Sequence, residues 1–173
     1  MNSDVFISNF DRTENSDKLH AILGRALIIA TRFDSMCEAA AINLELKKDA
    51  VLSTYMTEAE YGDYLSMLTS KYRTLNGNIK SIGLSDDISV ILGDARKARN
   101  VVAHNLSKGL EGCLDVRIDE LEFIAQVSEL VMDIAYGDIA ISYIISLFNG
   151  DLYPNEKFVS SYKDRVIQWV VGH

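Results

Sequence analysis

The sequence predicts an all-α protein, an antiparallel bundle of about five helices. Its 173 residues include a single Pro and only ten Gly, which favours long uninterrupted helices over a sheet with many turns. Apolar residues recur at alternating spacings of three and four in several long segments, which is the pattern of amphipathic helices. Capping residues followed by acidic residues precede several of these segments, as at helix starts.

The chain is predicted to form one domain. Residues 1–15 are a polar N-terminal segment without the basic-then-apolar build of a secretion signal. Residues 16–173 are expected to form a single helical domain, long enough to bury a core without disulfides. The two cysteines, Cys37 and Cys113, are too few for a disulfide framework. Together these features favour a cytoplasmic protein.

The first helix is expected to begin at Ser16 and Asp17, where a side-chain oxygen can cap free amides and an acid lies in the first turn. It should extend over about thirty residues, roughly 45 Å at 1.5 Å per residue. Its apolar seam suits close antiparallel packing and is long enough to be shared with a second subunit. The seam consists of Leu19, Leu23, Ala26, Ala30, Phe33, Cys37, Ala40 and Leu44.

The second and third helices each follow a capping residue. Thr57-Glu-Ala-Glu60 has the pattern of a capping box, and the apolar stripe behind it runs from Tyr61 to Leu75 and fades around residues 76–78. Ser85 is expected to cap the third helix, which should end before the glycines at 109 and 112. The expected core positions of the third helix are Ile88, Ile91, Ala95, Ala98 and Val102.

The last two helices complete the predicted bundle. The fourth is expected from about Ile118 to Phe148, and three charges within it indicate a buried core helix rather than a membrane span. The fifth should begin near Pro154, because proline is tolerated in a first helical turn. The short stretch 113–117 between the third and fourth helices could be extended. The three charges are Glu129, Asp133 and Asp138, and the apolar positions of the fifth helix are Phe158, Tyr162, Val166 and Trp169.

The net charge of −8 excludes one class of function, the non-specific nucleic-acid coat, because neutralisation of phosphates supplies most of the affinity of such proteins. A small local basic site is still compatible with this charge. The densest basic cluster of the sequence contains Arg96, Lys97, Arg99 and Lys108.

The third helix carries the most reactive chemistry, in the stretch Arg99-Asn-Val-Val-Ala-His104. A guanidinium can hold a phosphate, an amide can orient it, and an imidazole can carry a proton near neutral pH. On a regular helix, positions five apart differ by about 140°, so Arg99 and His104 of one chain do not converge on one phosphate. Either the helix loosens near His104, or two copies build a joint site about a two-fold axis.

This stretch resembles the signature of the HEPN superfamily, in which an Arg and a polar residue are followed by three further residues and a His. That superfamily contains metal-independent ribonucleases, among them toxins and anti-phage effectors, and also members that have lost activity and serve as binding modules. The resemblance implies a homodimer whose third helices face each other, with one cleft built from two motifs. It further implies an endoribonuclease of toxin or defence type that needs no cofactor.

The resemblance assigns catalytic roles to three residues. His104 is expected to act as general acid or base, Arg99 to stabilise the charge on the scissile phosphate, and Asn100 to orient either of them. The expected products are a 2′,3′-cyclic phosphate and a 5′-hydroxyl. Arg96 and Lys97 are candidate substrate contacts, although solvated surface is an equal alternative, and Asp94 is a candidate support for Arg99. No His, Cys or carboxylate grouping has metal-ligand spacing.

The expected partners are an RNA substrate, a second copy of the chain and an antitoxin such as a nucleotidyltransferase-like protein, with no membrane partner. Some HEPN toxins are silenced by AMP attached to a Tyr two residues after the motif His. This chain has Leu106 there, so that modification does not carry over, whereas an antitoxin that covers the cleft stays open.

Three alternatives stand beside the nuclease. One is a catalytically silent HEPN-like module that binds a protein partner or a nucleotide through the same groove. Another is a structural dimer built on the seam from Leu19 to Leu44. The third is a helix surface on which Arg99 and His104 are incidental polar groups.

Overall fold

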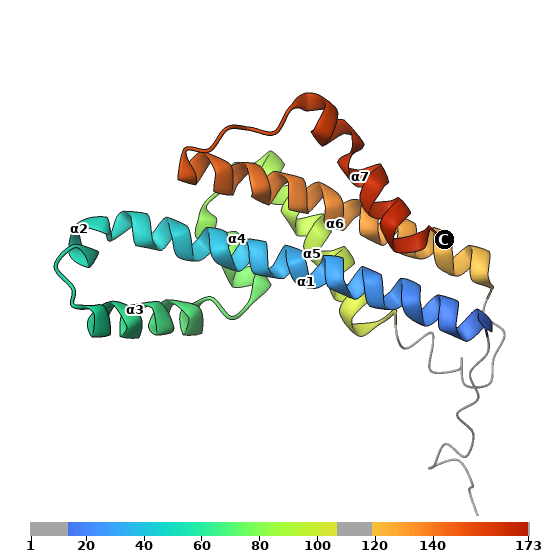
Figure 1. Ribbon diagram of the computed structural model, residues 1–173, viewed down its shortest axis with the longest axis horizontal. Coiled ribbons are helices and arrows are strands. Elements are labelled where there is room, and N and C mark those ends of the chain that lie inside the picture. Colours follow the sequence, from blue (N-terminus) through green and yellow to red (C-terminus); the bar gives the residue numbers. More distant parts are fainter. Residues whose placement is uncertain (1–13, 107–118, 173) are drawn as a thin grey trace, which may run out of the picture.

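The computed structural model describes residues 14–106 and 119–172 of the chain, and within those ranges every regular element is a helix (Figure 1). This confirms the prediction of an all-α bundle for the part of the chain described. The predicted turn glycines at 109 and 112, Lys108, Cys113 and the stretch 113–117 lie outside the described residues. The helices are α1 (Glu14–Lys48), α2 (Ala50–Ser53), α3 (Glu58–Lys71), α4 (Leu75–Ile82), α5 (Asp86–His104), α6 (Glu120–Asn149) and α7 (Glu156–Val171).

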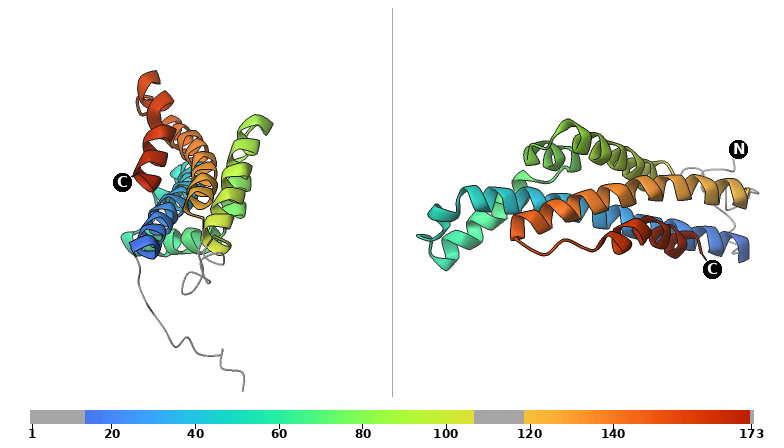
Figure 2. Two further views of the ribbon diagram at one scale, coloured as in Figure 1. Left: turned by 90° about the vertical axis from the view of Figure 1, so that its right-hand side faces the viewer. Right: turned by 90° about the horizontal axis from the view of Figure 1, so that it is seen from above.

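The two longest helices, α1 and α6, lie side by side along the molecule, and α5 and α7 flank this pair on opposite sides (Figure 2). α1 and α6 run parallel, because Lys18 pairs with Glu120 near the start of both helices. Near their ends, Lys47 Nζ lies 5.9 Å from the centroid of the Phe148 ring. α5 lies between α1 and α6 in the sequence, and in space it runs antiparallel to both (Figure 1). The predicted antiparallel arrangement therefore holds for α5 against its neighbours but is wrong for α1 and α6.

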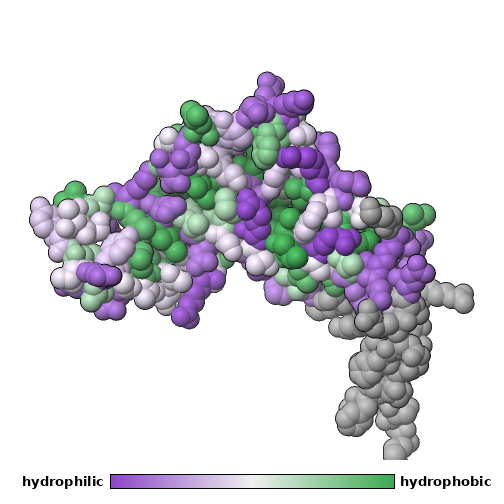
Figure 3. Space-filling view, in the orientation of Figure 1, coloured by the Kyte–Doolittle hydropathy of each residue, from purple (hydrophilic) through white to green (hydrophobic). Residues whose placement is uncertain are grey.

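The core lies where α1, α5 and α6 meet, and small residues bring these helices close together. Gly137 of α6 is buried, and a methyl group there would lie 2.4 Å from Cβ of Ala95 and 2.9 Å from Cε2 of Phe33. This contact fixes the position of α5 against α1 within one turn of Arg99. On the face seen in Figure 3, patches of hydrophobic residues lie among hydrophilic ones along the molecule.

The predicted seam of α1 is confirmed as core. Leu19, Ala26, Ala30, Phe33, Cys37 and Ala40 are buried, and the side chains at 23 and 44 are partly buried. Since helices of the same chain cover this seam, a structural dimer built on it is wrong. α1 begins at Glu14, two residues before the predicted start, so Ser16 and Asp17 lie within its first turn and a half.

The second predicted helix is in fact two helices. The capping box at Thr57 is confirmed, with the Thr57 backbone N–H donating to Glu60 Oε2 at 2.8 Å. However, α3 ends at Lys71, and Thr74 caps a separate α4 by accepting a hydrogen bond from the Gly77 N–H at 3.3 Å. The cluster at residues 76–78 therefore lies in the first turn of a helix instead of at the end of one. Leu75 belongs to α4, and Tyr61 is exposed.

The start of α5 falls where it is predicted, but one core position and the cap differ. The Ser85 side chain makes no capping hydrogen bond. Leu92 is fully buried, whereas Ile91 is 41% exposed. Ala95, Ala98 and Val102 are buried as predicted, and Ile88 packs partly buried against the core.

The starts of α6 and α7 fall close to their predicted positions. Asp119 caps α6, because its Oδ1 accepts hydrogen bonds from the N–H groups of Leu121 and Glu122. Asn155, and not Pro154, caps α7. Val166 and Val170 are the buried positions of α7, while Phe158 and Trp169 are exposed. The apolar face of α7 is therefore shifted by one position relative to the prediction at its C-terminal end.

Among the described helices, α6 is long and apolar enough to cross a membrane by length and composition. In the structure it packs against α1, α5 and α7. Its buried residues include Asp138, one of the three charges that indicated a core helix. Of the most apolar window of α6, 39% is buried inside the protein, so this helix contributes to the core and also has exposed apolar positions.

Candidate functional site

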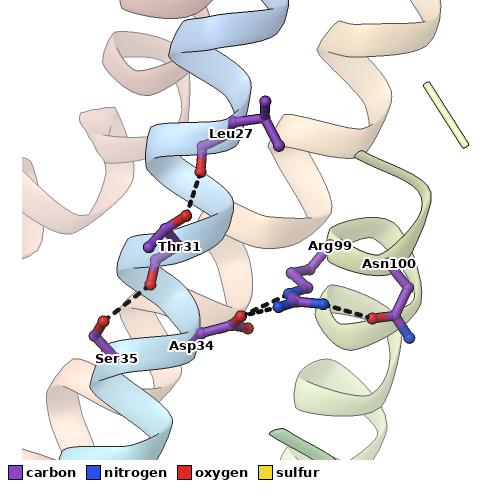
Figure 4. A network of polar contacts seen from close by, with 6 residues as sticks. All are labelled: Leu27, Thr31, Asp34, Ser35, Arg99 and Asn100. Carbon is purple, nitrogen blue, oxygen red and sulfur yellow. Dashed lines mark hydrogen bonds and ion pairs between the residues drawn. The ribbon is translucent and has the colours of Figure 1, made fainter. Parts of the chain in front are cut away.

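Arg99 is held in place by a carboxylate from another helix (Figure 4). Its Nε donates a hydrogen bond to Asp34 Oδ2 at 2.7 Å, and its Nη2 pairs with the same oxygen. Its Nη1 donates to Asn100 Oδ1 at 3.1 Å. The side chains of Arg99 and Asp34 are 24% and 25% exposed, respectively. The guanidinium is thus fixed between α1 and α5, and it in turn orients the amide of Asn100.

Local packing explains why Asp34 and Arg99 face each other. Asp34 follows buried Phe33 on α1, and Arg99 follows buried Ala98 on α5, so each lies at the edge of the apolar face of its helix. The close contact of Phe33, Ala95 and Gly137 holds these two edges together. Burial raises the pKa of the Asp34 carboxyl, while the hydrogen bonds and charge of Arg99 and the charge of His104 lower it. Asp34 Oδ1 is buried and has no hydrogen-bond partner among the described residues.

The sequence suggested Asp94 as the carboxylate that supports Arg99. In the structure that carboxylate is Asp34. Asp94 instead accepts a hydrogen bond from Lys97 Nζ at 2.7 Å on an exposed turn of α5. Helix geometry explains the difference: residues five apart, such as Asp94 and Arg99, lie on different faces, whereas residues three apart are neighbours. The sequence signal for Asp34 is its position beside Phe33, where an acid interrupts an apolar seam.

His104 is the last residue of α5 and its side chain is exposed. The helix stays regular up to this point, because the Asn105 N–H still donates to Val101 O at 2.9 Å. The helix is therefore regular as far as His104, and directly after it the Leu106 N–H donates to Val101 O at 2.8 Å, five residues back. His104 makes no hydrogen bond or ion pair with the residues that the structure describes. It lies on the outward stripe of α5 that also carries Val90, Asp94 and Lys97, spaced by three, four and seven residues.

A cavity of about 330 Å³ lies beside the ion pair of Arg99 and Asp34. Arg96 lines it, in keeping with its predicted contact role, whereas Lys97 and His104 do not. Its walls come from α1, α4, α5 and the turn between α3 and α4. The lining residues are Asp34, Glu38, Tyr72, Arg73, Thr74, Leu75, Asn76, Asn78, Arg96, Arg99 and Asn100.

Of the eleven lining residues, only Arg96, Arg99 and Asn100 were site candidates from the sequence, and Arg73 and Asn78 are among those that were missed. Asn78 lies on α4, a helix that the sequence did not predict, and it is 3% exposed. The available signal was Thr74, which precedes Asn78 by one turn and caps that helix.

Neither the described cysteine nor the described carboxylates and histidines form a nucleophile or a metal site. Cys37 is buried, and burial raises the pKa of its thiol to about 12, so it is a core residue rather than a nucleophile. Within residues 14–106 and 119–172, no three His, Cys, Asp or Glu side chains come together in a way that could hold a metal ion. No family model, no curated protein and no solved structure matches the chain.

Proposed function

We propose that this protein is a metal-independent endoribonuclease of the HEPN type that acts as a homodimer. The proposal rests on the arrangement of Arg99. Asp34 holds its side chain beside a polar cavity, and the helix that carries Arg99 also carries the exposed His104. A cation that is held in position before the substrate binds stabilises developing phosphate charge without a cost of reorganisation. The resemblance of the Arg99–His104 stretch to the HEPN signature supports the assignment.

The regularity of α5 supports the homodimer. Because Arg99 and His104 lie about 140° apart on an unbroken helix, one chain alone does not direct both toward one phosphate. A second copy about a two-fold axis supplies the missing half of each centre. The outward face of α5 suits such pairing, since Val90 is 62% and Ile91 41% exposed.

The proposed reaction is an internal transfer at phosphorus. His104 of one copy removes the proton from the ribose 2′-hydroxyl, and the 2′-oxygen forms a bond to phosphorus while the bond to the 5′-oxygen breaks. The 5′-oxygen takes up a proton, which an imidazolium donates. Arg99 of the other copy stabilises the negative charge that builds on the phosphate, and Asn100 orients it. The products are a 2′,3′-cyclic phosphate and a 5′-hydroxyl.

The biological setting that we propose is a cytoplasmic toxin or anti-phage effector that an antitoxin silences by covering this cleft. Leu106 is buried, so a covering partner would contact the outward face of α5 instead.

The test is cleavage of single-stranded RNA by the purified protein in EDTA. Wild type is expected to produce fragments with cyclic phosphate ends, and His104→Ala and Arg99→Ala should abolish cleavage. His20→Ala is the matched control, because His20 is an exposed histidine on α1. A wild-type dimer that leaves varied RNA intact, or a His104→Ala variant that still cuts, contradicts the proposal.

Mixed dimers test whether each centre is shared between two copies. If Arg99 comes from one copy and His104 from the other, a mixed dimer of the two single variants keeps one intact centre. An equal mixture contains about half mixed dimers, so roughly a quarter of wild-type activity should return. If no activity returns although mass spectrometry detects mixed dimers, each centre belongs to one chain.

A second candidate is the catalytically silent module, and the ion pair itself favours it. Asp34 already engages two nitrogens of Arg99, which reduces the positive charge available to a phosphate. Asp34→Asn discriminates between the two candidates. In a nuclease the variant loses the preorganised cation and cleaves more slowly, whereas in a silent module it exposes a cation and binds RNA more tightly without cutting it.

A further inference from the structure

A cavity of about 170 Å³ lies where α1, α6 and the first half of α7 meet. α5 and α7 flank the pair of α1 and α6 on opposite sides, so this cavity is separate from the site at Arg99 (Figure 2). Each residue that lines the cavity is at least partly exposed, so its walls are open to a ligand. None of its described lining residues carries a carboxylate.

Aromatic rings form much of the wall of this cavity. Tyr143 comes from α6, and Phe158 and Tyr162 come from α7, where the centroids of their two rings lie 5.8 Å apart. Apolar atoms make up most of the surface that lines the cavity. An apolar cavity of ~150 Å³ is large enough to hold benzene. The volume and the walls therefore suit a single aromatic ring, which can stack on a wall ring or meet it edge to face.

Two hydrogen-bond donors lie among these rings. Arg32 Nε donates to Asp138 Oδ2 at 3.1 Å, but the Arg32 side chain is still 48% exposed, and a guanidinium has further N–H groups. The Ser142 hydroxyl makes no hydrogen bond within the part of the chain that the structure describes. A carbonyl oxygen has two lone pairs, so one such oxygen can accept hydrogen bonds from both groups.

The charges around the cavity favour an uncharged ligand. Arg32 brings a positive charge to the wall, which repels a cation. Asp138 already balances this charge, and its side chain is only 3% exposed, so an anion would lose its hydration in an apolar cavity with little gain. We propose that this cavity binds one small, uncharged aromatic molecule that carries a carbonyl oxygen. This site goes beyond the proposed nuclease and is independent of it, because neither Arg99 nor His104 lines the cavity.

The first experiment titrates the full chain, labelled with 15N, with acetophenone and follows the backbone amide signals by NMR. Acetophenone should bind with a dissociation constant of roughly 1 mM or tighter and shift the amide signals of Ser142 and Val159. Benzoate and benzylamine, which add a charge, should bind at least roughly tenfold more weakly. Cyclohexyl methyl ketone, which has a saturated ring, should bind roughly fivefold more weakly. The absence of acetophenone binding overturns the site, and equal or tighter binding of a comparison compound overturns the ligand class.

The second experiment tests the two donors with a pair of ligands. Ser142→Ala removes the hydroxyl, and Arg32→Lys keeps a charge for Asp138 but removes the guanidinium. Each variant should weaken acetophenone binding by roughly fivefold, because one hydrogen bond is lost. Ethylbenzene has no oxygen, so its affinity should be the same in both variants and in wild type. Acetophenone binding that neither variant changes overturns the assigned donors, as does an equal loss for both ligands.

A third experiment fills the cavity to test where the ligand binds. Val159 lines the cavity, and Val159→Phe should occupy it and abolish the binding of acetophenone. Val51→Phe is the matched control, because Val51 is an exposed valine on α2 outside the cavity, and this variant should bind as wild type. Acetophenone binding by Val159→Phe at wild-type affinity overturns the site. If circular dichroism shows that Val159→Phe is unfolded, the variants of Ser142 and Arg32 decide the location.

Discussion

Replacement of Gly137 by Ala tests whether the contact of α1, α5 and α6 determines both the fold and the candidate site. The new methyl group would lie 2.4 Å from Cβ of Ala95 and 2.9 Å from Cε2 of Phe33. Carbon atoms in contact prefer about 3.5–4.0 Å, so α5 and α6 must move apart by roughly 1 Å. Ala95 Cβ is fixed to the backbone and cannot rotate away. The methyl group is therefore accommodated only by movement of a helix.

The expected loss follows from two opposing terms. Overpacking of a core costs about 1–3 kcal/mol, and Ala offsets part of it because it is about 1 kcal/mol better than Gly in a helix. We expect a net loss of up to about 2 kcal/mol, which lowers the melting temperature by up to roughly 8 °C for a chain of this size. Gly93→Ala on α5 is the control, because nothing lies within 4 Å of its added methyl group. It should stabilise the protein by up to about 1 kcal/mol.

Urea unfolding followed by circular dichroism measures both variants. The double variant of Gly137→Ala with Ala95→Gly removes the clash, so its loss should be smaller than the sum of the two single losses by about 1 kcal/mol or more. Ala95 precedes Arg99 by one turn of α5. The shift of α5 in Gly137→Ala should therefore also move Arg99 and slow any RNA cleavage. If Gly137→Ala is as stable as Gly93→Ala, the close contact does not exist and the placement of Arg99 against Asp34 loses its explanation.

Two further predictions concern buried or crowded carboxylates. Tyr162→Phe removes the hydroxyl that donates a hydrogen bond to Asp138 Oδ2. Because the Asp138 side chain is only 3% exposed, the variant should lose about 1–3 kcal/mol of unfolding free energy in urea. Tyr136→Phe, whose hydroxyl accepts from exposed Lys163, should change stability by less than about 0.5 kcal/mol, and equal losses in the two variants would contradict this reasoning. Burial and the charges of Asp94 and Glu129 raise the pKa of Asp133 above 3.8. The stability that this carboxyl contributes is therefore fully present below pH 3.8 and is lost as the pH rises through the raised pKa. Asp133→Asn should therefore match wild type at pH 3 and exceed its stability at pH 7 by only a few tenths of a kcal/mol, because Asp133 is exposed and solvent screens the repulsion, and a gain that is equal at both pH values would refute the assignment.

The sequence was sufficient to predict the helices that have strong local signals. The seam of α1 and the capping box at Thr57 follow from residue spacing, which local sequence encodes directly. α4 was missed because Asn76-Gly77-Asn78 has the composition of a turn, although tertiary contacts with α1 hold it as a helix.

The candidate site was only partly predictable for a different reason. Arg99, Asn100 and His104 share one helix, so their spacing is visible in the sequence. The partner of Arg99 lies 65 positions away on α1, and no local pattern pairs the two residues. Asp94 was the nearest acid along the chain, but the helix turns it toward Lys97 instead.

The parallel pairing of α1 with α6 has a consequence for how this chain folds. Its polar contacts join residues 102 and 106 positions apart, so the central contact forms only after a long stretch of chain has closed on itself. Topologies dominated by such distant contacts fold slowly compared with simple up-and-down bundles. A nascent chain that has emerged only as far as His104 leaves the apolar stripe of α1 without its main covering helix. During synthesis that stripe is a surface for chaperones or for aggregation until the last third of the protein arrives.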